Sequence, residues 1–261
     1  MLQPVVARPI CGLAEVFQGP GATGVRTLGG NAFQPSVGAL DVLLSTALSA
    51  LGLALAFGIP VVGRYRRAAS DELDWTRIRN VLVRNWAVLG VLAVIAAVSD
   101  SSSLGLRVPG VGPLVDGLLY GFVAFGATMI LVGLASRFVG GVVTSEASLV
   151  VLEQSVPRRL AVAVTGAVVE TTIFYGFAVE TLLGLGAGPL LAGTVAATGV
   201  VLSRARWGTG NALQWLPGAV VLSVVALWSG TALTVVGVRL LYDTLTTLSG
   251  DPDDYRTPSE T

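Results

Sequence analysis

The sequence predicts an all-α fold, a polytopic transmembrane helical bundle of about seven spans, with six as the fallback. Hydrophobic residues make up 53% of the 261 residues and charged residues only 12%, whereas soluble domains carry about 25% charged residues. Apolar stretches recur along the whole chain, and none of them alternates as a half-buried strand does. Because only helices and closed barrels satisfy their backbone in lipid, we expect these stretches to be helices.

The ends of the chain differ from its apolar middle. Residues 1–37 are expected to form a mobile tail, because Gly19-Pro20-Gly21 and Gly29-Gly30 interrupt them and no apolar run has the length of a signal peptide. Residues 38–249 are expected to form the bundle, and 250–261 an acidic tail. Within the bundle the apolar stretches lie near residues 42–63, 86–98, 114–136, 160–186, 189–203 and 218–249.

The last apolar stretch is too long for one span. It has 32 residues, about 48 Å of helix against a hydrocarbon core of roughly 30 Å. We therefore expect this stretch to break near Gly230 and to supply two spans.

The arginine distribution sets the expected orientation. Twelve of the 16 basic residues, all of them Arg, lie in segments 64–85, 137–159, 204–217 and 250–261, and three lie in the segments expected on the other side. The positive-inside rule therefore predicts an outside N-terminus and a cytoplasmic C-terminus. Exclusive use of Arg, together with the acidic tail, favours a prokaryotic plasma membrane.

The composition excludes most familiar active sites. The chain has no His and a single Cys, and its formal net charge is zero. Without imidazole it cannot form a Ser-His-Asp triad, a His-ligated zinc site or a haem held by His. A disulfide within the chain is excluded, and the charge balance predicts no nucleic-acid partner. We expect no cofactor and no metal, and the lipid bilayer as the first partner.

Ionisable residues inside the apolar stretches are the candidates for function, since each costs roughly 2.5–3.5 kcal/mol at the centre of a span. Asp116 lies near a helix end, where water reaches it, and is set aside. Glu170 lies in the middle of its stretch and needs a partner from another helix. Glu180 lies ten residues later and about 280° around an α-helix, so the two carboxylates should not form a dyad. Five such residues stand out in the sequence: Asp116, Glu170, Glu180, Arg239 and Asp243.

Arg239 and Asp243 are four residues apart in the last stretch, so that one helix face carries both. They can form an internal ion pair that makes two costly charges tolerable, or they can be the remnant of a reactive site. The sequence leaves both readings open.

The segment Val168–Phe177 resembles the EExxxRG motif of the CPBP family, which contains the type II CAAX prenyl endopeptidases and bacteriocin-processing or immunity proteins. Glu170 takes the place of the first Glu and Gly176 that of the Gly. Thr171 replaces the second Glu and Tyr175 replaces the Arg. The resemblance implies an intramembrane helical bundle with Glu170 as a catalytic remnant.

Two later motifs of that family can be aligned in the same order over residues 155–249. Gly188-Pro189 begins the next helix, where Val200 and Arg204 fall at the Phe and His of the FxxxH motif. Arg239 and Asp243 fit the HxxxN or HxxxD motif with Arg in place of His. A guanidinium only donates hydrogen bonds and cannot bind a divalent cation or accept a proton. The resemblance therefore implies a pseudoprotease, in which Arg204 or Arg239 could meet Glu170 across helices.

Three functions remain as hypotheses. The first is a catalytically inactive CPBP-like membrane protein that binds or scaffolds a membrane protein or a lipidated peptide. The second is an atypical intramembrane endopeptidase that uses Glu170 alone. The third is a small transporter component in which Glu170, Arg239 and Asp243 line a polar pathway.

Overall fold

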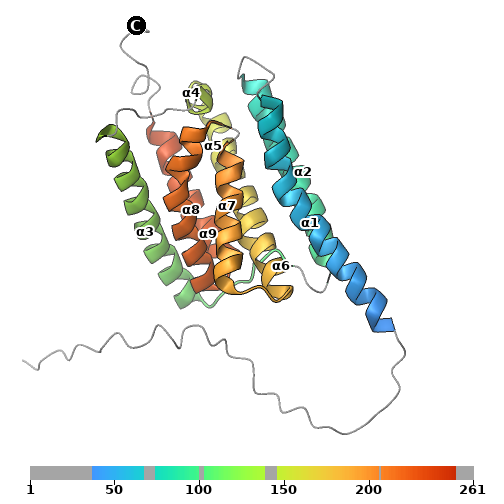
Figure 1. Ribbon diagram of the computed structural model, residues 1–261. Helices are drawn as coiled ribbons and strands as arrows, with labels where there is room; N and C mark the ends of the chain where they lie inside the picture. The colour runs from blue at the N-terminus through green and yellow to red at the C-terminus, as the bar shows by residue number, and fades with distance from the viewer. Residues whose placement is uncertain (1–36, 68–73, 100–102, 139–145, 206, 251–261) are drawn as a thin grey trace, which may run out of the picture. The chain divides into compact units, whose positions relative to one another are not determined.

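A computed structural model of the chain describes residues 37–67, 74–99, 103–138, 146–205 and 207–250. The chain divides into two units, Met1–Val37 and Gly38–Thr261, and the helices belong to the second unit (Figure 1). The expected mobile tail therefore lies outside the described residues, apart from Val37, and so does the acidic tail beyond Gly250.

The described residues form helices and no strands, as predicted for an all-α fold. Seven of the nine α-helices are separate elements, whereas α5 and α6 are joined by two π-helical segments into one continuous helix. In chain order the elements are α1 (Val37–Arg67), α2 (Trp75–Val98), α3 (Val111–Phe138), α4 (Glu146–Leu152), α5 (Val156–Thr165), η1 (Gly166–Glu170), η2 (Thr172–Ala178), α6 (Val179–Gly184), α7 (Pro189–Ala205), α8 (Thr209–Ser229) and α9 (Ala232–Ser249).

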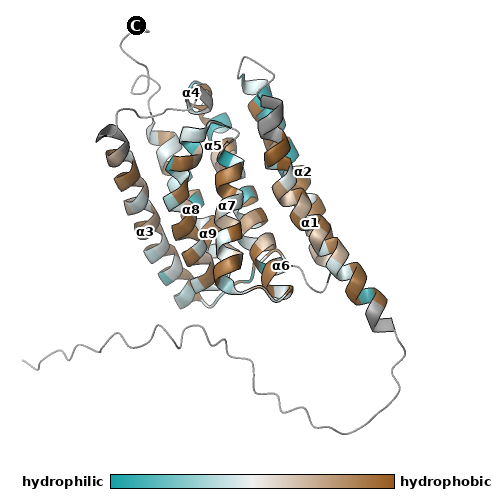
Figure 2. Cartoon of the chain, viewed as in Figure 1, coloured by the Kyte–Doolittle hydropathy of each residue, from teal (hydrophilic) through white to brown (hydrophobic). Residues whose placement is uncertain are grey.

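Five helical segments among the described residues are long and apolar enough to cross a membrane. The exposure of the first three segments supports a membrane location, because only 11–17% of the most apolar part of each is buried inside the protein. Figure 2 shows hydrophobic residues along much of these helices. Such large exposed apolar faces are rare in soluble proteins and are compatible with an integral membrane protein. The five segments are Leu40–Val62, Trp75–Val98, Val111–Ala135, Val156–Gly184 and Thr209–Ser229.

The second helix begins earlier than the apolar stretch 86–98 suggested. Its first turn is set by Asp74, whose Oδ1 accepts a hydrogen bond from the backbone N–H of Arg77 at 2.8 Å. An N-cap of this kind satisfies one of the free N–H groups at a helix start. The charged residues Arg77, Arg79 and Arg84 hid the first half of α2 from a search for apolar runs.

The break predicted near Gly230 is confirmed. Gly230 ends α8 in the left-handed conformation, with φ of 65°, and its N–H bonds to the carbonyl of Ala226 at 3.0 Å. Thr231 then caps α9, because its hydroxyl accepts from the N–H of Leu233 at 3.1 Å. Glycine reaches this backbone conformation without a steric penalty, which explains why the long apolar stretch turns there.

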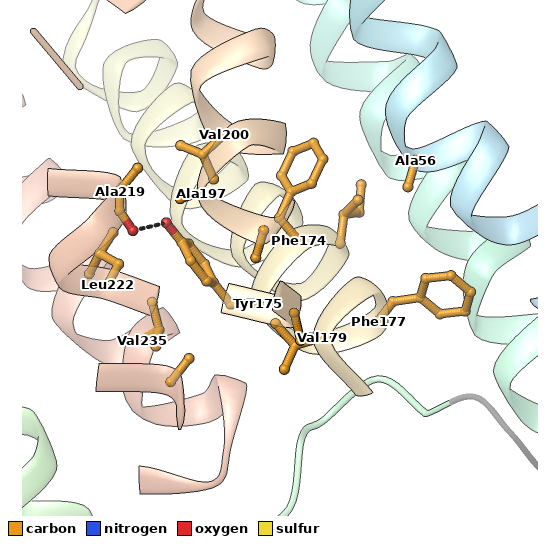
Figure 3. Packing of buried hydrophobic residues seen from close by; sticks show 14 of the residues in the cluster. Ala56, Phe174, Tyr175, Phe177, Val179, Ala197, Val200, Ala219, Leu222 and Val235 are labelled. Atoms are coloured by element: carbon orange, nitrogen blue, oxygen red, sulfur yellow. Dashed lines mark hydrogen bonds between the residues drawn. The ribbon is translucent and has the colours of Figure 1, made fainter. Parts of the chain in front are cut away.

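The central helix, Val156–Gly184, is the most buried of the candidate spans, with 78% of its window inside the protein. Its middle consists of the π-helical segments η1 and η2, which the sequence analysis did not predict. Tyr175 points toward α8, whereas Phe174 and Phe177 point away from it, and Phe177 packs on Gly52 of α1 (Figure 3). π-Helix is rare and is frequently found at functional sites, and here it carries Glu170 at the end of η1.

Candidate functional site

Four charged side chains from three helices meet inside the bundle. Glu170 comes from η1, Arg204 from the last turn of α7, and Arg239 and Asp243 from α9. We call these four residues the ionic cluster. Its formal charges sum to zero, so the two guanidiniums compensate the two carboxylates within the protein.

Glu170 lies at the centre of the ionic cluster and points into the bundle, as predicted. It is 5% exposed. Its Oε2 accepts from Nη2 of Arg204 at 2.8 Å and from Nη1 of Arg239 at 3.4 Å. Its Oε1 lies 3.1 Å from the hydroxyl of Ser203, which shares its single proton between this oxygen and the carbonyl of Val200 at 2.8 Å. Both carboxylate oxygens therefore face donors.

Arg239 is fully buried and is held by two acidic partners. Its Nε and Nη2 donate to Oδ2 of Asp243 at 3.2 and 2.7 Å, and its Nη1 donates to Glu170. The prediction that an acidic partner holds this guanidinium is confirmed, and the pair within α9 is extended to a second helix. Such a pairing is what a charge needs to be tolerated away from water.

Three residues complete the surroundings of the cluster, and the sequence analysis missed all of them. The indole of Trp215 lies 4.2 Å from the guanidinium carbon of Arg204 and 4.9 Å from that of Arg239, measured to the ring centroid. Gly166 leaves room for the cations, because a Cβ atom there would lie 3.3 Å from Nη2 of Arg239. Ser203 is the third, through its bond to Glu170. All three contact the cluster through the tertiary fold, and no spacing in the sequence predicts such contacts.

The other residues aligned to the family motifs do not join the ionic cluster. Thr171 is fully buried, and its hydroxyl has no hydrogen-bond partner in the described part of the chain. Tyr175 donates to the carbonyl of Ala219 at 2.8 Å (Figure 3). Val200 is a fully buried core residue. Gly176 packs against the backbone of the loop before α3.

The two remaining intramembrane acids lie apart from the cluster. Glu180 accepts from Nη2 of Arg107 at 3.0 Å and from the hydroxyl of Ser103 at 3.3 Å, in a group separate from Glu170. This arrangement agrees with the expectation that Glu170 and Glu180 form no dyad. Asp116 is exposed near the start of α3, as expected for a carboxylate at a helix end.

Replacing Tyr175 by Phe should have only a modest effect on stability, because its hydroxyl bonds to the carbonyl of Ala219 and not to the ionic cluster. We expect a loss of about 0.5–1.5 kcal/mol in the free energy of unfolding, the usual net value of one hydrogen bond. Thermal unfolding of the detergent-solubilised variant measures it. A loss of about 3–5 kcal/mol, the usual cost of breaking a buried ion pair, would contradict this assignment and make Tyr175 part of the ionic cluster.

A cavity of about 420 Å³ opens beside the ionic cluster. Glu170, Arg204 and Asp243 line one part of it, and Trp207 and Trp215 lie near them in the wall. The volume falls in the range of about 300–1,000 Å³ that is common for small-molecule sites. Further walls are apolar and come from α2, α3 and α4, at Ile78, Val81, Leu82, Met129, Val151 and Leu152.

The chemistry of the cluster disfavours metal binding. Among the described residues no three His, Cys, Asp or Glu side chains are placed to hold a metal ion together. Arg204 and Arg239 occupy the two positions at which the aligned family motifs have His, and a guanidinium offers donors only. The carboxylates of Glu170 and Asp243 already accept hydrogen bonds from these two guanidiniums.

Comparisons with protein-family models, with curated proteins and with solved structures give no match for this chain.

Proposed function

We propose that the chain is an integral membrane protein of the CPBP kind that binds a membrane-embedded or lipidated partner in the cavity beside the ionic cluster and does not hydrolyse it. One observation carries the proposal. Both oxygens of Glu170, the carboxylate aligned with the family's catalytic Glu, are engaged by donors from Ser203, Arg204 and Arg239.

Proton chemistry at Glu170 is disfavoured by these contacts. A general base must present a free carboxylate oxygen to its water, whereas both oxygens of Glu170 already face donors from Ser203, Arg204 and Arg239. General base catalysis alone contributes about 10²–10⁴-fold, whereas enzymes accelerate their reactions by about 10⁶–10¹⁷-fold. An atypical endopeptidase that uses Glu170 alone is therefore the second reading.

Binding is supported by the character of the cavity. Its volume of about 420 Å³ and its mixture of apolar and polar walls suit an amphipathic occupant. The walls include residues beside the loops that the sequence assigns to the arginine-rich side, such as Trp207 and Thr247. With the proposed orientation, N-terminus outside and C-terminus in the cytoplasm of a prokaryote, the cavity opens at the cytoplasmic face.

The proposal includes seven spans, in which α7 and α9 join the five long apolar segments. The 17 residues of α7 span about 26 Å, close to the roughly 30 Å of the hydrocarbon core. In α9 the intramembrane charges of Arg239 and Asp243 are compensated within the ionic cluster. Seven spans that alternate in direction then place the N-terminus and the C-terminus on opposite sides of the membrane, as proposed above.

A farnesylated peptide tests the proposed function. We expect the purified full chain to bind it without cleaving it and to contain no stoichiometric zinc. Fluorescence anisotropy of the labelled peptide measures binding, mass spectrometry measures cleavage, and elemental analysis measures metal. Asn211→Trp adds bulk at the cavity wall and should weaken binding. Leu213→Trp is the control, because Leu213 of α8 is 63% exposed and its replacement should leave binding unchanged.

Two results would reverse the assignment. About one zinc per chain would contradict the expected absence of a metal site, and cleavage that Glu170→Gln abolishes would establish an active endopeptidase. Failure of the farnesylated peptide to bind, combined with ion flux that Glu170→Gln abolishes in proteoliposomes, would favour the transporter component instead.

A further inference from the structure

Arg204 is the member of the ionic cluster whose donors are least used. Arg239 takes both bonds that Asp243 receives and one of those to Glu170, whereas Arg204 makes a single bond, to Glu170. Its side chain is 18% exposed and lines the cavity. Its Nε–H is buried without a hydrogen-bond partner in the described part of the chain. The guanidinium has further N–H donors besides the one bonded to Glu170, so an acceptor in the cavity can bond to its accessible part.

A second polar group in the cavity wall also lacks a partner. The side-chain oxygen of Asn211 is buried and has no hydrogen bond to any described residue. As an acceptor, this oxygen does not itself favour an anion. The N–H donors of Arg204 are the group in this wall that suits a carboxylate or a phosphate.

The charges of Glu170 and Asp243 do not cancel this preference, because each is already compensated. Asp243 accepts two bonds from the fully buried Arg239, and Glu170 accepts bonds at both oxygens. The charges of the cluster sum to zero, and the exposed part of Arg204 provides the polar end of the cavity with N–H donors that are not used by these carboxylates.

The opposite walls select an apolar chain. Ile78, Val81 and Leu82 of α2 face the cavity with Val151 and Leu152 of α4. Arg204 lies one residue before the end of α7, and the neighbouring Trp207 and Trp215 are of the type that gathers at membrane interfaces. A membrane amphiphile can therefore lay its hydrocarbon chain against these apolar walls while its head meets the polar residues at the other end of the cavity.

We propose that the cavity binds an anionic single-chain amphiphile, whose carboxylate or phosphate head contacts Arg204 and whose hydrocarbon chain lies against α2 and α4. This inference rests on the proposed function only in taking the cavity as a binding site. It adds a requirement for a negative charge on the ligand, which the proposed function alone does not make.

A brominated fatty acid tests both the ligand class and its place, because bromine quenches tryptophan fluorescence on contact. The full chain is prepared in detergent with Trp215 as its single Trp, the others being replaced by Phe, and is titrated with dibromostearate at a pH that keeps the acid ionised. We expect saturable quenching that is roughly tenfold tighter than that by the methyl ester of the same acid. A matched chain that keeps only Trp228, which is 54% exposed on the same helix, should show quenching without saturation.

Substitution of Arg204 identifies the head-group contact. Arg204→Gln should bring the acid and its ester to within about threefold, whereas Arg204→Lys should keep most of the difference, since it retains the charge. Arg107→Gln, which removes the same charge from a side chain that is 72% exposed, is the control. Thermal unfolding of each variant identifies any that fail to fold, and Arg204→Lys then decides the result.

Three outcomes would overturn the inference. Equal saturation by acid and ester would show a site for apolar chains without charge recognition. Protection of Trp215 by acetate or inorganic phosphate as effective as that by unbrominated stearate would show a site for soluble anions. Quenching of Trp215 without saturation would show no site. A farnesylated peptide that fails to bind while dibromostearate saturates would refute the proposed function and leave this inference standing.

Discussion

Arg239→Leu is expected to destabilise the protein by about 3–5 kcal/mol, the usual cost of removing one member of a buried ion pair. The guanidinium is fully buried and makes three hydrogen bonds to two carboxylates. Its removal leaves Asp243 without a cation and Glu170 with Arg204 alone. Chemical or thermal unfolding in detergent measures the loss.

Second substitutions show which carboxylate suffers more. Adding Asp243→Asn to Arg239→Leu should restore more stability than adding Glu170→Gln, because Glu170 keeps its bonds from Arg204 and Ser203. Arg107→Leu, at a side chain that is 72% exposed, is the control and should cost no more than about 1 kcal/mol.

An unchanged unfolding temperature for Arg239→Leu would contradict the ionic cluster. So would a double-mutant cycle in which neither second substitution couples to the first. Arg239 would then be solvated by a water-filled path, and the reading as a transporter component would become the stronger one.

Gly176→Ala is expected to cost roughly 1–3 kcal/mol by overpacking, although alanine favours helices. A Cβ atom at this position would collide with the carbonyl oxygen of Leu104, which belongs to the backbone and cannot rotate away. The loop of Leu104 is itself fixed, since the carbonyl of Gly105 accepts from the N–H of Ala232 at 2.8 Å and from the hydroxyl of Thr231 at 3.0 Å. Thermal unfolding checks the loss.

Gly90→Ala is the matched control, because a Cβ atom on this exposed α2 glycine would meet nothing within 4 Å. It should be neutral or raise stability by up to about 1 kcal/mol. If Gly176→Ala were equally harmless, the close approach between the central helix and the Leu104 loop would be wrong.

The residues aligned to the CPBP motifs fall into two groups. Glu170, Arg204, Arg239 and Asp243 meet in one ionic cluster, although their positions in the sequence span more than 70 residues. The other aligned positions serve packing, with Tyr175 bonded to α8 as the clearest case.

The sequence by itself determined the helical, membrane-compatible character of the chain, because its apolar stretches lack the alternation of strands and a helix satisfies their backbone hydrogen bonds within lipid. It also determined the break at Gly230 and the need of Arg239 for an acidic partner, since both follow from local geometry or from the cost of one charge. Only the tertiary structure decided that Glu170 bridges two arginines and that Trp215 lies against both. These contacts join residues from different helices, and their distances depend on how the helices pack rather than on any spacing along the chain.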